Sequence, residues 1–369
     1  MEIYEKRLSR QDLESLTGEL SAIGGVRRVV LDDGAERGIR ALEFRTGTGL
    51  SFDVLVDRAM DIGQAEFQGR SFGWRSAVGL RHPGLHEPSG EDGLSWLRSV
   101  TGLIATAGLD HTMYKAEVDA SEYGLPSRKS IRHSLHGRIA NTPARLVGYG
   151  ESWDSDRCIL RAEGVVRQAA LFGENLELHR RIESDLGSSE IRIFDTVRNC
   201  GFDRTPHMYL YHINFGWPLL DQGSRFIAPI VKTRWRSETT PEHHDIYDSF
   251  PGPLPGCPEQ VYEHELAAKP DGRTNVLLAN DRLHFGVEVE WRMAELPCFI
   301  QWLYLREGAY VLGVEPSTHH IQGNLSARED GSMIWLNHGD SRTYHLTLKV
   351  LSSKATLDGA ASRIQSSVT

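Results

Sequence analysis

The chain has 369 residues, of which 40% are hydrophobic and 25% are charged, and its formal net charge at pH 7 is -9. This composition is typical of a globular protein; it excludes a disordered chain and, without a basic run, does not favour nucleic-acid binding. No apolar stretch reaches the roughly 18 residues of a membrane span and no secretory signal is visible, so we expect a cytoplasmic protein that does not contact a membrane.

Only two segments have a helical pattern. Residues 9–22 begin with Ser9 as an N-cap and have Asp12 three residues later, which is close to a capping box. Residues 93–101 form the second predicted helix. The sequence has no G-x-G-x-x-G motif that opens a helix and no P-loop, so we expect no nucleotide cofactor.

Alternating apolar and polar residues predict many β-strands. Residues 39–57 read as a hairpin that turns at Thr46-Gly47-Thr48-Gly49. Further strands are expected at 157–167, 175–184, 189–199, 206–216, 283–291, 298–305, 309–316 and 342–351. Many strands with few helices indicate an all-β protein, built as a large antiparallel sandwich or barrel.

Two long stretches, 108–135 and 236–274, lack a strand pattern, and structureless loops of that length are usually functional or disordered. No change in composition marks a linker. The sequence therefore predicts three parts: an N-terminal helical extension over 1–24, one β domain over 25–352, and a flexible tail over 353–369.

The strand expected at 206–216 carries polar side chains on an otherwise apolar face. A period of two places Met208, Leu210, His212 and Asn214 on that face. A histidine suits acid–base catalysis near neutral pH. A hydrogen-bonded histidine of the core is the alternative interpretation.

Glu315 follows an apolar strand, has no cation near it in the sequence, and precedes Pro316. A carboxylate that emerges from a buried strand must be paired, protonated or functional. Glu315 is thus either one half of a structural ion pair or a general base with a raised pKa.

Two shorter segments carry further candidate residues. In the first segment, Gly137 lies between His136 and Arg138 and permits a close approach of the backbone. Arg138 could bind hydroxyls or an anion. In the second, Arg58 stands between two carboxylates, one of them Asp61. An ordinary turn and a solvated ion cluster are the respective alternatives.

Together these segments resemble the aldose 1-epimerase (galactose mutarotase-like) superfamily over about residues 25–350. Residues 211–215 are similar to the family's Asn-His-x-Tyr-Phe-Asn-Leu segment, whose histidine protonates the ring oxygen of the sugar. Residues 313–316 are similar to its Gly-x-x-Leu-Glu-Pro-Gln segment, whose glutamate removes the anomeric proton. Residues 136–141 are similar to the His-Gly segments that hold sugar hydroxyls.

When residues 57–63 and 108–110 are included, the chain most resembles a bacterial branch of this superfamily whose substrate is poorly defined. The chain departs from the mutarotase pattern at Tyr211, Asn214 and Ser317.

The resemblance implies a β-supersandwich with a few short helices and a carbohydrate isomerase that interconverts sugar anomers by acid–base ring opening. It implies His212 as the general acid, Glu315 as the general base, and no cofactor or metal. We expect a small-molecule carbohydrate as the partner, and a homodimer as one form the chain could take. The expected substrate contacts are Arg58, Asp61, Asp110, His111, His136, Arg138, Asn214, Gln301 and Trp302. The arginines suggest a substrate with a carboxylate, phosphate or sulfonate.

Two other functions stay open at this point. The sixteen histidines, with His243-His244-Asp245 and His319-His320 among them, are compatible with a metal-dependent isomerase, lyase or oxygenase on the same sandwich. The four cysteines form no Cys-x-x-Cys pair, which argues against a zinc ribbon. The third possibility is a sugar-binding protein without catalysis.

Overall fold

The computed structural model describes residues 1–121, 129–237 and 247–367. Its strands are β1 (Glu2–Ile3), β2 (Lys6–Arg7), β3 (Gly25–Val30), β4 (Arg40–Arg45), β5 (Leu50–Leu55), β6 (Asp61–Phe67), β7 (Arg70–Ser71), β8 (Ile104–Leu109), β9 (Ala116–Asp119), β10 (Ser130–His133), β11 (Arg145–Asp154), β12 (Arg157–Ala169), β13 (Asn175–Asp185), β14 (Glu190–Asn199), β15 (Thr205–Phe215), β16 (Arg225–Ile227), β17 (Ile230–Arg236), β18 (Gln260–Leu266), β19 (Arg273–Asn280), β20 (Phe285–Arg292), β21 (Cys298–Tyr304), β22 (Val311–Ser317), β23 (Ile334–Leu336) and β24 (Ser341–Leu351).

The helices are short. The α-helices are α1 (Arg10–Leu16), α2 (Gly90–Gly93), α3 (Gly323–Glu329) and α4 (Lys354–Gln365). The 3-10 helices are η1 (Leu20–Ala22), η2 (Gly34–Glu36), η3 (Pro83–Leu85), η4 (Ser95–Arg98), η6 (Ile139–Asn141) and η7 (Asp281–Leu283). Among the described residues, no helix has the length and apolar character to span a membrane.

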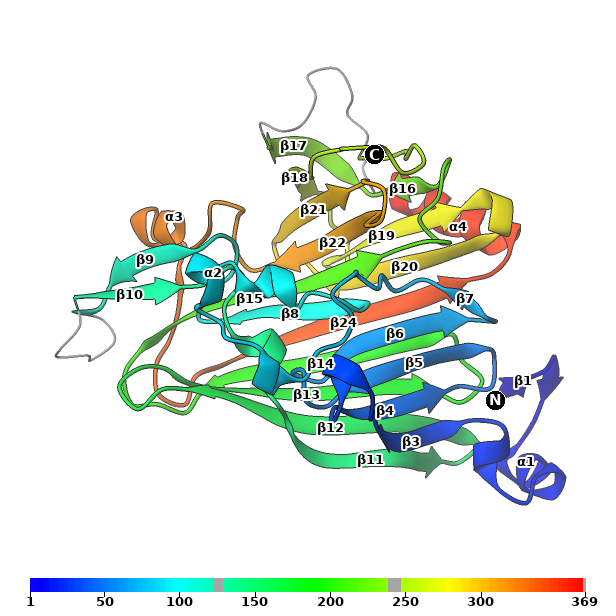
Figure 1. The fold of residues 1–369 in the computed structure, drawn as a ribbon. Helices are drawn as coiled ribbons and strands as arrows, with labels where there is room; N and C mark the ends of the chain where they lie inside the picture. Colours follow the sequence, from blue (N-terminus) through cyan, green and yellow to red (C-terminus); the bar gives the residue numbers. More distant parts are fainter. Residues whose placement is uncertain (122–128, 238–246, 368–369) are drawn as a thin grey trace.

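Three antiparallel sheets form the body of the molecule. One has eight strands in the order β11-β12-β13-β14-β24-β20-β19-β16. The second has seven strands in the order β17-β18-β21-β22-β15-β23, with β8 also paired to β15, and the third has five, β3 to β7 in chain order. Figure 1 shows the seven- and five-stranded sheets side by side in one layer, with the eight-stranded sheet behind them. This is the predicted β-supersandwich.

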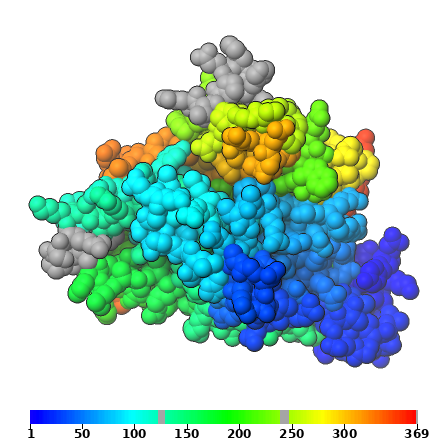
Figure 2. All heavy atoms as spheres, in the orientation of Figure 1, coloured from blue at the N-terminus to red at the C-terminus, as the bar shows by residue number. Residues whose placement is uncertain are grey.

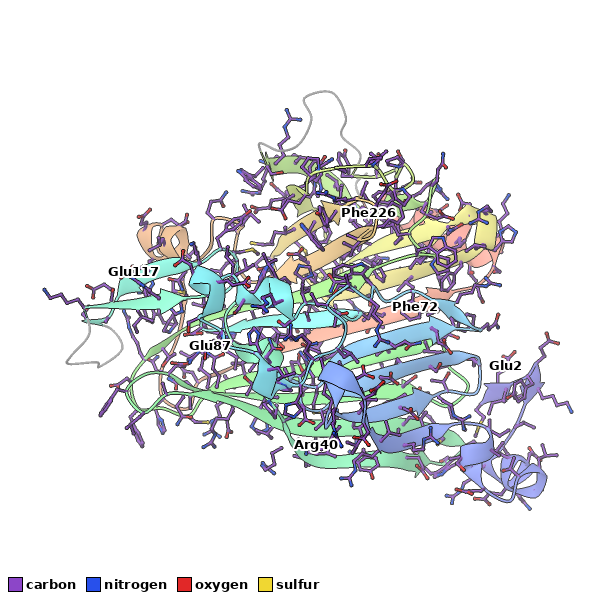
Figure 3. All side chains as sticks on the ribbon, viewed as in Figure 1. Glu2, Arg40, Phe72, Glu87, Glu117 and Phe226 are labelled. Atoms are coloured by element: carbon purple, nitrogen blue, oxygen red, sulfur yellow. The ribbon has the colours of Figure 1, made fainter. Side chains whose placement is uncertain are left out.

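The main core lies between these two layers. It joins Phe44 of the five-stranded sheet to Leu160 and Ile193 of the eight-stranded sheet, all almost fully buried. Phe72 and Phe226, labelled in Figure 3, belong to the same core. Alternation of apolar residues along each strand supplies one buried face per sheet, and the two buried faces pack together.

All the predicted strands form, within a few residues of the predicted bounds. The hairpin at 39–57 becomes β4 and β5, and the run at 342–351 becomes β24. The clear alternation at 175–184 and 189–199 gives β13 and β14, which pair with each other along most of their length. Period-two patterning was a sufficient signal in these segments because one face of each strand is buried.

The predicted helices are shorter than expected. In place of 9–22, α1 covers seven residues; its N-terminus is the predicted capping box of Ser9 and Asp12, and it ends where Thr17 is extended, just before the helix-breaking Gly18. In place of 93–101 there are two separate turns, α2 and η4, because the backbone around α2 leaves the helical region.

The two stretches expected to be irregular contain strands. The stretch 108–135 includes the hairpin β9–β10, and 236–274 includes β18 and the start of β19. Residues 122–128 and 238–246 within them lie outside the described part of the chain. β18 escapes sequence patterning because both its faces are buried and both carry polar residues.

The prediction of a flexible tail over 353–369 is wrong for most of its length. Ser353 caps α4 through a capping box with Thr356. The helix buries Leu357, Ala360 and Ile364 on one side, where they pack against residues of β19 and the end of β24. Small residues at helical spacing concealed an amphipathic helix that covers the eight-stranded sheet.

Candidate active site

Two buried polar side chains face each other on neighbouring strands of the seven-stranded sheet. β15 and β22 are antiparallel with Ile213 opposite Val314, and this register places His212 opposite Glu315. His212 Nε2 lies 3.3 Å from Glu315 Oε1, and each side chain is only 4% exposed. The structure thus brings together the two residues for which catalysis was predicted, although they are far apart in the sequence.

Alternate residues of β15 point to opposite sides of the sheet. Tyr209 and Tyr211 point into the core between the layers, where their hydroxyls donate hydrogen bonds of 2.7 and 2.6 Å to Asp195 of β14. His212 therefore lies on the outer face, away from the eight-stranded sheet. The predicted division of this strand into two faces is confirmed.

Asn214 fixes the orientation of the His212 ring. His212 Nδ1 lies 2.6 Å from Asn214 Oδ1. The amide nitrogen of Asn214 donates to the carbonyls of Gly102 and His212, which leaves its oxygen as the acceptor. Nδ1 therefore carries a hydrogen, and Nε2 is the atom directed at Glu315. Asn214 was expected to contact substrate, and the structure makes it a positioning residue behind the imidazole.

Burial changes the protonation of both members of the pair. It raises the pKa of Glu315 to about 8, with a further contribution from the charge of Glu259. It lowers the pKa of His212 to about 4, against the opposing effect of the hydrogen bond to Asn214. These pKa shifts favour, at neutral pH, a protonated Glu315 beside a neutral His212 imidazole.

A cavity of about 300 Å³ opens onto this pair. The ring centroids of Trp96 and Trp302 lie 5.1 and 5.5 Å from that of His212. η4, which carries Trp96, belongs to the cyan segment at the surface that faces the viewer in Figure 2. The residues that line the cavity are Leu94, Trp96, Leu97, Met113, Tyr114, Leu135, His136, His212, Glu259, Val261, Ile300, Trp302, Glu315 and Ile321.

Gly313 makes room for the Glu315 carboxyl group. A Cβ at this position would lie 2.9 Å from Glu315 Oε1 and 3.1 Å from the Cβ of Trp302. A glycine inside a strand costs stability, and it usually marks a place where another group approaches closely. Here the approaching groups are the carboxyl group and the indole of the cavity.

His136 reaches the cavity from a strained turn. Its φ of 58° lies in the left-handed region, which costs a non-glycine residue about 1 kcal/mol or more. Its ring centroid is 5.5 Å from that of His212, and its Nδ1 is buried without a hydrogen-bond partner among the described residues. Gly137 allows the turn, because a Cβ there would lie 2.4 Å from the carbonyl oxygen of Gly108.

Three predicted substrate contacts lie in a different place. Asp110 and Arg138 line a second cavity of about 330 Å³ beside Glu174, and Glu87, labelled in Figure 3, lies at its edge. Asp110 accepts a hydrogen bond from Gln168, and Arg138 pairs with Glu174. His111 stacks on His133 beside this cluster. These residues form a polar cluster separate from His212 and Glu315.

Arg58 and Asp61 are buried away from the cavity at His212. Asp61 pairs with Arg180 of β13 at 2.7 Å. Arg58 donates to the carbonyl of Ser99, and its Nε and Nη1 have no partner among the described residues. Neither residue lines the cavity at His212. The two residues belong to a buried group of charges. Within this group Asp61 pairs with Arg180, which lies 119 residues later in the sequence.

Gln301 points to the opposite side of β21 from the cavity. It is fully buried, receives a hydrogen bond from His264 and donates to the carbonyl of Tyr247. Trp302, the next residue, faces the cavity as predicted. Trp217 is 67% exposed and lies outside the cavity.

The histidines considered as metal ligands that the structure describes, His319 and His320, do not line the cavity at His212 and Glu315. His243, His244 and Asp245 lie outside the described residues. His319 Nδ1 forms a hydrogen bond of 2.7 Å with the hydroxyl group of Thr318. His320 lies beside Glu263 and Cys298, one strand away from Glu315.

Three aromatic or polar residues of the cavity were not predicted from the sequence. Trp96 stands inside the segment 93–101, which was interpreted as a helix. Tyr114 and Glu259 lie in the stretches expected to be irregular. Glu259 accepts a hydrogen bond of 3.1 Å from the Trp302 indole. The length of these stretches was the available signal that they carry functional residues.

Comparisons with known proteins agree with this architecture. The sequence model of a domain of unknown function, DUF4432, matches residues 36–350. No curated protein sequence matches the chain at a significant level.

Among solved structures, a Klebsiella pneumoniae protein provisionally described as an aldose 1-epimerase has a TM-score of 0.84 at 23% identity, over 93% of this chain and 88% of its own. A galactose mutarotase-like protein from Clostridium acetobutylicum has a TM-score of 0.60 at 14% identity, over 89% and 98%. The fold is therefore that of the galactose mutarotase-like proteins.

Proposed function

We propose that this chain, which belongs to the DUF4432 family, is a carbohydrate isomerase that interconverts the anomers of a free sugar. The observation that carries the proposal is the contact of 3.3 Å between His212 Nε2 and Glu315 Oε1 at a cavity. The two sugar oxygens that exchange protons, the ring oxygen and the C1 hydroxyl, are bonded to the same carbon. An acid and a base that serve them must therefore be neighbours.

A protonated Glu315 beside a neutral His212 suits a reaction that needs one acid and one base. The base removes the proton of the C1 hydroxyl, C1–O1 becomes a carbonyl, and the bond from C1 to the ring oxygen breaks. The electron pair stays on the ring oxygen, which takes a proton from the acid. Ring opening thus moves the proton of the pair from one residue to the other. After rotation about C1–C2, closure on the other face moves it back.

The predicted roles correspond to one of the two proton positions. With the proton on His212, the imidazolium is the acid and the Glu315 carboxylate is the base, as the sequence predicted. Burial disfavours both charged forms, so before the sugar binds we expect the proton on Glu315. In this proposal both positions are used in turn, one for opening and the other for closure.

The lining of the cavity supports an uncharged sugar as substrate. The described residues that line it include two tryptophans and several leucine, isoleucine and valine side chains, and no arginine or lysine. The arginines that suggested an anionic substrate, Arg58 and Arg138, lie elsewhere. Aromatic rings stack on the C–H faces of sugars, and the unpaired Nδ1 of His136 offers a hydrogen-bonding position to one hydroxyl.

Exchange NMR on a panel of neutral and acidic sugars tests the proposal. The rate of interconversion between the two anomeric C1–H signals is measured with and without the protein, and again after treatment with a chelator. We expect one or more neutral sugars to exchange faster with the protein, and the effect to survive the chelator. An absence of acceleration for every sugar on the panel would contradict the proposal.

The activity should depend on pH as a bell-shaped curve. Below about pH 4 both His212 and Glu315 carry protons, so the pair has no base, and above about pH 8 neither does, so the pair has no acid. We expect kcat/KM to fall on both sides of this window, because kcat/KM reports the pKa values of the free enzyme. A rate that rises continuously from pH 5 to pH 10 would show that the pair does not act as described.

Trp302→Ala should weaken sugar binding. Trp302 faces the cavity beside His212, and loss of a stacking ring costs about 1.4 kcal/mol, which is a tenfold rise in KM. Because the indole does not touch the protons that move, kcat should change less than KM. Steady-state kinetics would separate the two effects. Trp217→Ala removes an exposed tryptophan outside the cavity and is the matched control, for which both constants should stay as in the wild type.

A further inference from the structure

Three side chains that commonly bind metals converge one strand away from the acid–base pair. Glu263 lies on β18, Cys298 on β21 and His320 in the segment that follows β22. Each offers one ligand atom, and these atoms all lie within 4.8 Å of one another. In the described part of the chain this is the one group of three such residues with that arrangement.

Sheet register explains why these residues meet. Glu263 is opposite Ile300, and Ile300 is opposite Glu315. Cys298 lies two residues before Ile300 and therefore on the same outer face. The turn after β22 returns to this face, where the backbone N–H of Ile321 donates a hydrogen bond of 3.2 Å to Glu263 Oε2. His320 is thereby held over the other two ligands.

The polar atoms of the group are not all satisfied by one another. Cys298 Sγ and Glu263 Oε1 both contact Nδ1 of His320, with 3.4 Å between the sulfur and the nitrogen. A ring nitrogen has either one hydrogen or one lone pair, so it serves one of these two neighbours at a time. A cation can instead accept a lone pair from all three. Tetrahedral zinc, with ligands at about 2.0–2.3 Å, separates them by distances similar to this sulfur–nitrogen contact.

The charges of the group also favour a cation. The Glu263 side chain is 3% exposed, and among the described residues its ion-pair partner is the half-exposed His320. A divalent ion would compensate the buried carboxylate and displace the thiol proton. Thiolate and imidazole ligands select zinc-type ions over magnesium and calcium.

We propose that Glu263, Cys298 and His320 form a binding site for a zinc-class divalent cation. The His320 side chain is 45% exposed, so a fourth ligand position is accessible to water. The ion would not touch the reacting atoms, because Ile300 stands between Glu263 and Glu315 in the sheet. Its role would be structural, because it would join β18, β21 and the segment that follows β22.

Titration of the metal-free full chain with Co²⁺ tests the proposal without any measurement of activity. A thiolate bound to Co²⁺ gives a charge-transfer band in the near ultraviolet, and tetrahedral Co²⁺ gives visible bands. We expect both at one equivalent of metal, and we expect Zn²⁺ to displace them. We also expect Zn²⁺ to raise the melting temperature of the wild type, because it binds the folded state.

Two variants and one control make the result specific. Cys298→Ser should abolish the charge-transfer band, and His320→Ala, a change at a half-exposed position, should weaken binding by at least tenfold. Cys158→Ser alters a buried cysteine of β12, 1% exposed and away from the group, and should bind as the wild type does. The proposal is overturned if the wild type gives no band at one equivalent, or if the band persists in Cys298→Ser. Neither result bears on the anomer-exchange test.

Discussion

Glu315→Gln is expected to lower kcat for anomer interconversion by roughly 10²–10⁴-fold, the contribution typical of one acid–base group. At neutral pH the Glu315 side chain is a neutral carboxylic acid, because burial raises its pKa to about 8. An amide has the same shape and can still hydrogen-bond to His212, but it cannot give up or accept the proton that ring opening and closure require. Sugar binding should therefore persist while turnover is lost.

Exchange NMR measures both quantities on one sample, since exchange between anomeric signals reports turnover and line broadening of the sugar reports binding. Glu307→Gln is the matched control. Glu307 lies exposed in the turn between β21 and β22, and the same substitution there should leave the rate unchanged. A Glu315→Gln protein with more than a tenth of the wild-type rate would remove Glu315 from the proposed mechanism.

Arg180→Met is expected to lower the free energy of unfolding by about 3–5 kcal/mol, the cost of removing one partner from a buried ion pair. Arg180 is fully buried between the two layers. Its guanidinium pairs with Asp61 at 2.7 Å and with Asp195 at 2.8 Å, and it donates to the hydroxyls of Thr106 and Tyr209. Methionine fills a similar volume but leaves the two carboxylates without this cation.

Urea unfolding followed by tryptophan fluorescence measures the loss. Arg181→Met is the control on the same strand, because Arg181 is 42% exposed and pairs with Glu183 at the surface, where ion pairs contribute about 0–1 kcal/mol. Tyr211→Phe is a milder second variant. It removes one hydrogen bond to Asp195 and should cost about 1.5–3 kcal/mol. Equal stabilities of the Arg180 and Arg181 variants would show that the network is not a major source of stability.

This network also connects stability to the candidate site. Tyr209 and Tyr211 alternate along β15 with the residues of the outer face, and both bind Asp195 on the inner face. Hydrogen bonds to the Asp195 carboxylate therefore hold the inner face of the strand that carries His212. Rigid support of this kind keeps a catalytic side chain in its working geometry.

Much of the fold could be predicted from the sequence because local patterns are strong in it. The alternation along 175–184 and 189–199 gave β13 and β14, and the capping box at Ser9 gave the start of α1. In β18 both faces are buried and both carry polar residues, so neither an alternation nor an apolar run marked this strand. In α4, alanines at helical spacing resembled the small residues of a tail.

For the candidate site, too, some residues could be predicted from the sequence and others could not. His212 and Glu315 were predicted from their local context, a polar residue on an apolar strand, and from the resemblance of their segments to the mutarotases. The assignment of substrate contacts depended on which residues meet in space. Gln301 and Trp302 are adjacent in the sequence and point to opposite faces of β21, and the face that holds the cavity was not identifiable locally.

From the sequence alone, the all-β class, the strands with clear alternation and the candidate residues His212 and Glu315 could therefore be predicted. The tertiary structure alone decided the partner of each charge: Asp61 pairs with Arg180, Arg138 with Glu174, and Glu263 with His320 and Cys298. Side-chain periodicity is set by neighbouring residues, so a local pattern reveals it. A buried charge is stabilised by whichever opposite charge the fold brings within reach, and that partner can be distant in the sequence: Asp61 and Arg180 are 119 positions apart.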